Sequence, residues 1–118
     1  MFPVEDIPDP AVLFRWLYPG SVAAGRRIKP NAFRMQGSGV STYWKEYSTA
    51  EWCKSQCRDD VGVLRVVAGE ARLEGFQVVH TPRAPHNRSH ADIRGVEVKL
   101  RSKLAKIAHI EIDPPSLE

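Results

Sequence analysis

The pattern of apolar and polar positions predicts a small domain in which strands and helices interleave. The clearest strand is 62–68, GVLRVVA, whose nearly continuous apolar character predicts an interior position covered on both faces. Further strands are predicted at 40–47, 76–79 and 110–112. Because these elements lack strict βαβ periodicity, we expect an α+β fold with a mixed or antiparallel sheet and two or three helices.

Two helices are predicted from side-chain periodicity and capping. In 99–109, apolar residues recur on one face and lysines occupy the other, as in an amphipathic helix. The segment 48–51, Ser-Thr-Ala-Glu, fits a capping box, in which the first hydroxyl and the last carboxylate bind the free amides of a helix start. This predicts a helix from there to about Cys57.

The segment 9–18 is ambiguous. Asp9-Pro10 resembles a helix cap followed by proline at the first helical position, and Pro19-Gly20 would end the helix. Residues 12–17 are also rich in strand formers, so a strand is the alternative, but the cap favours a short helix. The segments 21–39 and 70–75 are predicted as loops and turns.

Composition indicates one soluble domain. The chain has 118 residues, 42% of them hydrophobic and 26% charged, which is typical of a single globular domain covering 1–118. Residues 1–8 are acidic and contain prolines, which predicts an extended or frayed arm rather than a signal peptide. With no apolar run near the roughly 20 residues of a membrane span, we expect a cytoplasmic protein without a membrane partner.

Charge is distributed unevenly. Between 81 and 106 there are seven basic residues and two acidic ones, a surplus of five, so the rest of the chain is negative by two within a net charge of +3. A basic surface of this kind attracts phosphate groups, nucleic acid or an acidic protein partner. The alternative is a solvated face that only keeps the protein soluble. The basic residues are Arg83, Arg88, Arg94, Lys99, Arg101, Lys103 and Lys106.

The segment 76–95, FQVVHTPRAPHNRSHADIRG, is the richest in chemical groups and contains three of the four histidines. Its prolines and final glycine predict a polar loop after a strand, where binding and catalytic residues often lie. We expect His80 or His90 to act as general acid or base and Asn87 to orient a ligand. The alternative for His90 is structural: it holds the loop in place through Asn87 and Asp92.

A zinc site is a weaker hypothesis. Cys53 and Cys57, together with His86 and His90, provide two sulfur and two nitrogen ligands of the kind zinc prefers. The cysteines fall within a predicted helix, however, and lack the glycine-containing knuckle of such sites. We therefore expect two thiols in a reducing compartment, no metal and no cofactor.

The chain resembles a family of small uncharacterised bacterial and phage proteins over most of its length. The shared segments are Phe14-Arg15, Pro30-Asn-Ala-Phe33, Gly39-Val-Ser41, Gly62-Val63 and Asn87-Arg-Ser-His90-Ala-Asp-Ile-Arg-Gly95. The chain departs from that family at Asn31, where serine is common, and at Thr42, where valine is common. The resemblance implies a bacterial or phage origin but no particular reaction.

The resemblance also marks four candidate catalytic residues: Arg15, Ser41, Asn87 and His90. Candidate phosphate-binding residues come from the basic segment, namely Arg83, Arg88, Arg94, Lys99, Lys103 and Lys106. The oligomeric state and the identity of any substrate do not follow from the sequence.

Three functions are compatible with these residues. We expect an accessory or binding protein that uses the basic loop and helix to hold a protein partner or a phosphate-bearing ligand. A nucleotide-directed enzyme is the first alternative, because Arg15 and Ser41 followed by Tyr43 and Trp44 resemble the nucleotide-binding half of ADP-ribosyltransferases. Nucleic-acid binding, with Tyr43, Trp44 and Trp52 stacking on bases, is the second.

Overall fold

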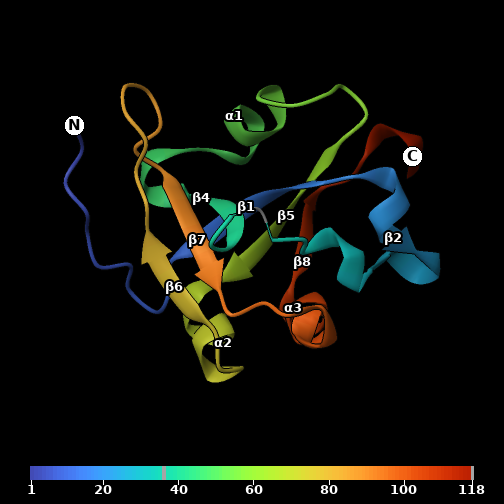
Figure 1. Ribbon diagram of the computed structural model, residues 1–118. Coiled ribbons are helices and arrows are strands. Elements are labelled where there is room, and N and C mark those ends of the chain that lie inside the picture. Colours follow the sequence, from blue (N-terminus) through green and yellow to red (C-terminus); the bar gives the residue numbers. More distant parts are fainter. Residues whose placement is uncertain (36, 118) are drawn as a thin grey trace.

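The computed structural model describes residues 1–35 and 37–117, and its central feature is a six-stranded antiparallel sheet with the order β6-β7-β4-β1-β5-β8 (Figure 1). Two short strands, β2 and β3, form a separate antiparallel pair. The predicted α+β class is thereby confirmed. The strands are β1 (Val12–Leu17), β2 (Val22–Ala23), β3 (Arg27–Ile28), β4 (Val40–Trp44), β5 (Gly62–Val67), β6 (Gln77–His80), β7 (His90–Arg94) and β8 (His109–Ile112).

Three short helices cover the two faces of the large sheet. Helix α1 (Ala50–Ser55) lies over one face, and α2 (Ala68–Leu73) and α3 (Arg101–Ile107) lie on the opposite side (Figure 1). Single turns of 3-10 helix connect many of the elements. These turns are Pro19–Ser21, Ala24–Arg26, Pro30–Ala32, Lys45–Tyr47, Val98–Leu100 and Pro115–Leu117.

Alternation along the strands builds a separate core on each face. In β1, Leu13 and Leu17 join the larger core, which includes Leu104 of α3. Phe14 points the other way and packs with Cys53 of α1. Because neighbouring side chains of a strand point to opposite faces, one apolar strand supplies both cores. The predicted interior strand 62–68 is confirmed as β5, which pairs with β1 and β8.

The helix predicted over 9–18 is wrong, because this segment forms strand β1. All six of its residues pair with β5, and two of them also pair with β4. A six-residue apolar segment held by strands on both sides gains more from sheet pairing and burial than a short helix gains from its cap. The Asp9-Pro10 signal instead marks a turn before the strand.

Two further local predictions are corrected. Helix α1 has Thr49 as its cap, with the hydroxyl accepting from the Trp52 amide at 3.0 Å, so the capping box starting at Ser48 is wrong. The helix also ends at Ser55, before Cys57. The predicted turn at 70–75 is largely helix α2 (Ala68–Leu73), which buries Ala68 and Ala71 against the sheet.

The remaining expectations for single segments are confirmed in part. The helix predicted at 99–109 is present as a 3-10 turn followed by α3, and strand β8 already begins at His109. Residues 21–39 hold turns and the small β2–β3 sheet rather than plain loop, with position 36 outside the described residues. None of the helices in the described ranges is long and apolar enough to span a membrane.

The N-terminal arm is extended and anchored. The Glu5 amide donates to Nδ1 of His80 at 2.9 Å, and the Glu5 carboxylate accepts from the Tyr47 hydroxyl at 2.7 Å. Ile7 is buried in the larger core. These contacts link residues that are far apart in the sequence, and they hold the arm beside the β6 end of the sheet (Figure 1).

The most consequential difference concerns 90–94, which was predicted as loop. These residues form β7, which pairs with β4 on one side and β6 on the other. Only 81–89 is a loop, closed by reciprocal backbone hydrogen bonds between Arg83 and Asn87. His90 therefore stands on an interior strand, where its position is fixed more firmly than a loop would fix it.

Close packing at Gly62 gives a test of this fold. A Cβ at this position would press against the Ile112 carbonyl oxygen and the Pro114 nitrogen, both backbone atoms that cannot move aside easily. We expect Gly62→Ala to lower the free energy of unfolding by about 1–3 kcal/mol, as overpacking does. Urea denaturation measures this change. Gly20→Ala is the matched control, since no atom lies within 4 Å of its added Cβ, and equal effects of the two substitutions would contradict the packing.

Candidate functional site

The candidate site lies where strands β1 and β4 separate. Their ladder covers only the pairs Leu13–Trp44 and Phe14–Tyr43. Beyond these two pairs, the Arg15 side chain connects the strands: its Nη1 donates to the Ser41 carbonyl of β4 at 2.7 Å. Nε donates to the Ala32 carbonyl at 2.8 Å. One guanidinium thus joins two strands and the turn after β3.

A pocket of about 200 Å³ opens at this place. It brings together three of the four candidate catalytic residues, Arg15, Ser41 and His90, which come from three different strands. Asn87 is not among the lining residues, and its side-chain oxygen accepts from the Ser89 hydroxyl at 2.8 Å. Asn87 therefore shapes the loop. The full lining is Arg15, Trp16, Tyr18, Ser41, Tyr43, Arg83 and His90.

Arg15 brings a half-buried positive charge to the pocket. Burial lowers the pKa of its guanidinium, because the charged form loses hydration. Its hydrogen-bond partners are the carbonyls of Ala32, Ser41 and Arg34. Among the described residues, no carboxylate lies within 4 Å of this guanidinium. The pocket therefore contains a cation without a matching anion from the protein, an arrangement that buried charges usually avoid.

His90 is a neutral histidine on the pocket wall. Its side chain is only 2% exposed, and its Nδ1 lies 3.2 Å from the Thr81 carbonyl oxygen. The Thr81 hydroxyl lies closer to the same Nδ1, at 2.8 Å, and a hydroxyl can donate or accept, so Thr81 can hold either neutral tautomer of the ring. Nε2 is buried and has no partner within the part of the chain described here. Burial, and secondarily the charge of Arg83, lower the pKa of His90, so the ring is neutral near pH 7.

His80 is a histidine of the opposite kind. Its Nδ1 accepts from the Glu5 amide at 2.9 Å, so its Nε2 carries the proton and donates to the Arg88 carbonyl at 2.6 Å. Both ring nitrogens are used, and the ring ties the N-terminal arm to the loop before β7. The structural role considered for His90 therefore also describes His80. For His90 both roles stay predictions, since its Nδ1 contacts the Thr81 hydroxyl and carbonyl at the start of the loop.

The basic residues of 81–106 do not form one surface. Arg83 reaches the pocket, whereas Arg88 lies over the Tyr47 ring at 4.0 Å and pairs with Glu5 at 3.2 Å. Helix α3, with its lysines, lies at the opposite end of the sheet from the 81–89 loop (Figure 1). Arg94 ends β7, four residues along the strand from His90. Of the candidate phosphate-binding residues, Arg83 alone lines this pocket.

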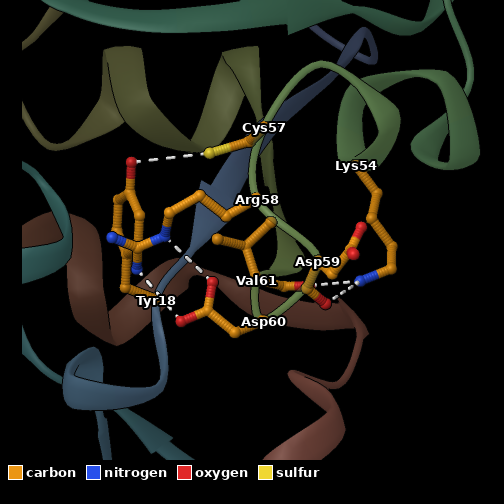
Figure 2. A network of polar contacts seen from close by, with 7 residues as sticks. All are labelled: Tyr18, Lys54, Cys57, Arg58, Asp59, Asp60 and Val61. Atoms are coloured by element: carbon orange, nitrogen blue, oxygen red, sulfur yellow. Dashed lines mark hydrogen bonds and ion pairs between the residues drawn. The ribbon is translucent and has the colours of Figure 1, made fainter.

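Of the three rings in the aromatic wall, Tyr43 was anticipated from the sequence as a stacking candidate, whereas Trp16 and Tyr18 were not. Trp16 is fixed by a hydrogen bond from its Nε1 to the Cys53 carbonyl at 2.6 Å, and it lies 5.8 Å from the Tyr43 ring. Tyr18 is clamped from outside: Arg58 stacks on its ring at 4.8 Å while binding Asp60 (Figure 2). In a strand, side chains alternate between the two faces, so a strand at 12–17 predicts that Trp16 shares the face of Phe14. This prediction was not made because the segment was expected to be a helix.

The cysteines do not build a metal site with the histidines. Both thiols are free, as expected. Cys53 is buried on the face of α1 that packs against Phe14, and burial raises its pKa to about 12. The Cys57 sulfur lies 3.7 Å from the Tyr18 hydroxyl (Figure 2), and His86 is exposed on the loop. In residues 1–35 and 37–117 no group of three or more His, Cys, Asp or Glu side chains is arranged to hold a metal ion.

Comparison with protein-family models, with curated proteins and with solved structures finds no match to this chain. The site is therefore interpreted from its own geometry. That geometry combines two arginines, a neutral histidine whose buried Nε2 has no partner among the described residues, a serine and three aromatic rings around a small hollow. Such a pocket is suited to an anionic group, and its histidine is suited to accept a proton or a hydrogen bond.

The lowered pKa of His90 predicts a pH-dependent stability. Because the unfolded chain has the higher histidine pKa, near 6.5, it binds more protons below that pH, and the folded state loses stability as pH falls from about 6.5 toward the folded pKa. His90→Asn keeps a hydrogen-bonding atom near the Nδ1 position and should flatten this decline. Urea unfolding at several pH values measures it. A decline of the same size in His90→Asn would contradict the assignment.

Proposed function

We propose that this chain is a cytoplasmic accessory or binding protein, of bacterial or phage origin, that holds a small phosphate-bearing ligand in the pocket between β1, β4 and β7. The observation that carries the proposal is the half-buried guanidinium of Arg15, which lines the pocket without a carboxylate partner among the described residues. An anionic ligand would supply the missing charge.

The hydrogen-bond inventory favours phosphate. A guanidinium has five N–H donors, and three contacts to carbonyls occupy part of Arg15, which leaves two donors for a ligand. Arg83 adds a second charge, and the hydroxyls of Ser41 and Tyr43 add further donors. Two positive charges match a phosphate monoester, which carries nearly two negative charges near pH 7. A hollow of about 200 Å³ accommodates such a group and excludes a macromolecular surface.

The basic helix supports the competing proposals less well. Lys99, in the 3-10 turn before α3, lies 3.6 Å from Glu97, and Lys106 of α3 lies 3.9 Å from Glu74, so part of the positive charge of this segment is already compensated. These exposed pairs are weak, but they reduce the attraction to nucleic acid or an acidic partner. The pocket, in contrast, combines burial with charge, which strengthens any interaction with an anion.

A second candidate function is proton transfer on the bound phosphate ester. The specific observation is the neutral ring of His90, whose buried Nε2 has no partner among the described residues and is an acceptor in the tautomer that carries the proton on Nδ1. A base of this kind can take a proton from a water or hydroxyl that attacks a bound ester. Binding and catalysis would use the same pocket, so they are separated by experiment.

Arg83 gives the direct test of binding because it is exposed and is replaced with little risk to the fold. We expect Arg83→Gln to weaken the binding of ribose 5-phosphate roughly tenfold, the effect of losing one charged hydrogen bond. Isothermal titration calorimetry measures the Kd. Lys103→Gln, which removes the same charge from α3, is the control and should leave the Kd unchanged. Binding that is insensitive to Arg83 but lost in Lys103→Gln would move the site to the helix.

His90 separates binding from turnover. If the second candidate holds, His90→Asn should keep ligand affinity within a few-fold and reduce hydrolysis of phosphate monoesters by about 10²–10⁴, as loss of a general base does. Released phosphate is the measurement, with Arg83→Gln as a comparison that affects binding first. A wild-type protein that binds the ligand without hydrolysing it would rule out the catalytic function and leave only the binding function.

A further inference from the structure

A second hollow lies beside the first and has no role in the proposed function so far. It measures about 460 Å³ and opens between the turn after β4, the start of α1 and the 81–89 loop. Its lining combines two aromatic rings, three hydroxyl groups and one histidine. These residues are Tyr47, Ser48, Thr49, Trp52, His86 and Ser89.

The two hollows share a wall. Trp52 lines the second, Tyr43 lines the first, and their ring centroids are 5.4 Å apart in an edge-to-face arrangement. Ser89 and His90, neighbours in the chain, line the second and the first respectively. Residues that line the two hollows are therefore in contact, which places the hollows next to each other.

The first hollow alone is too small for a whole ligand. Ligand pockets usually measure about 300–1,000 Å³. At about 200 Å³, the first hollow holds one anionic group and little more. The first and second hollows taken together fall within the usual range, so the remainder of the ligand extends toward Trp52.

Hydrogen bonding defines what the second hollow accepts. The Ser48 hydroxyl donates to the Trp44 carbonyl at 2.8 Å, and the Ser89 hydroxyl donates to Asn87 at 2.8 Å. Their oxygens therefore remain as acceptors. Thr49 accepts from the Trp52 amide at 3.0 Å, so its own proton is available to donate. A flat ring with donors and acceptors on its edge matches this set better than a phenyl or alkyl group.

We propose that the two hollows together bind one nucleoside phosphate, with its base against Trp52 and its phosphate between Arg15 and Arg83. This inference rests on the proposed function, since the phosphate occupies the same pocket. A half-buried indole offers an aromatic face for a base, and stacking of a base on an aromatic side chain contributes about 1–3 kcal/mol. The sugar would span the wall formed by Tyr43 and His90.

Calorimetry with four probes tests the two parts separately: inorganic phosphate, ribose 5-phosphate, adenosine and adenosine 5′-monophosphate. We expect the nucleotide to bind at least roughly tenfold more tightly than ribose 5-phosphate. Trp52→Leu should raise the Kd of the nucleotide to that of ribose 5-phosphate, and Trp52→Phe should preserve most of the difference. Arg83→Gln should weaken the three phosphate probes and leave adenosine unaffected.

A measurement on the wild-type protein protects the test against a misfolded Trp52→Leu variant. The indole N–H resonance of Trp52, assigned by its disappearance in Trp52→Phe, should shift with the nucleotide and stay unmoved with ribose 5-phosphate.

The outcomes distinguish the two proposals. Equal affinities for ribose 5-phosphate and the nucleotide, with an unmoved Trp52 resonance, would overturn the nucleoside assignment and leave the phosphate site standing. Absence of binding by all phosphate-bearing probes would overturn the phosphate site and this inference together. Adenosine binding that matches the nucleotide and ignores Arg83 would also reject both, since the phosphate would then contribute nothing.

Discussion

The guanidinium of Arg15 is the contact on which the arrangement of this sheet depends. The pairing of β1 with β4 connects the two halves of the sheet, β6-β7-β4 and β1-β5-β8. This pairing ends after two residue pairs. Where the backbones separate, Arg15 bonds the Ser41 carbonyl of β4 and the Ala32 carbonyl of the turn after β3. A shorter side chain could not span this gap, and a neutral one would form weaker hydrogen bonds to the carbonyls. The pocket lies at this gap between the strands, so the charge of Arg15 borders the pocket.

The electrostatics of the pocket follow from the partial burial of Arg15. A partly desolvated cation held only by carbonyl dipoles costs free energy, which an anionic ligand would offset. Arg83 increases the positive potential, and together with burial it keeps His90 neutral, so a third positive charge is avoided. Thr81 holds the ring in place through contacts of its hydroxyl and carbonyl with Nδ1. The result is a site with two cationic donors and one neutral histidine, which differ in protonation because their surroundings differ.

The sequence predicted the elements whose apolar residues form a clear run or a clear face. Strands β5 and β8 and helix α3 carry apolar residues at regular spacing, and they were located within a few residues. Strand β7 was missed because His90 and Asp92 lie on the face of the sheet that carries the candidate site. These polar residues make the sequence of β7 resemble a polar loop. Strand β1 was missed because the cap signal before it is local, whereas its pairing with β5 bridges some fifty residues of chain. Arg15, Ser41 and His90 were chosen by residue type and resemblance, but their proximity depends on strand order, which no local pattern contains.

Anion binding and the protonation of His90 are coupled in this geometry. A phosphate between Arg15 and Arg83 would compensate their charges and thereby raise the pKa of His90, which burial and Arg83 hold low in the free protein. By linkage, the ligand must then bind more tightly as His90 takes up a proton, provided that the phosphate keeps its charge. In the bound state the histidine would act as a donor to the ligand at lower pH and, in the tautomer that carries the proton on Nδ1, as an acceptor at higher pH.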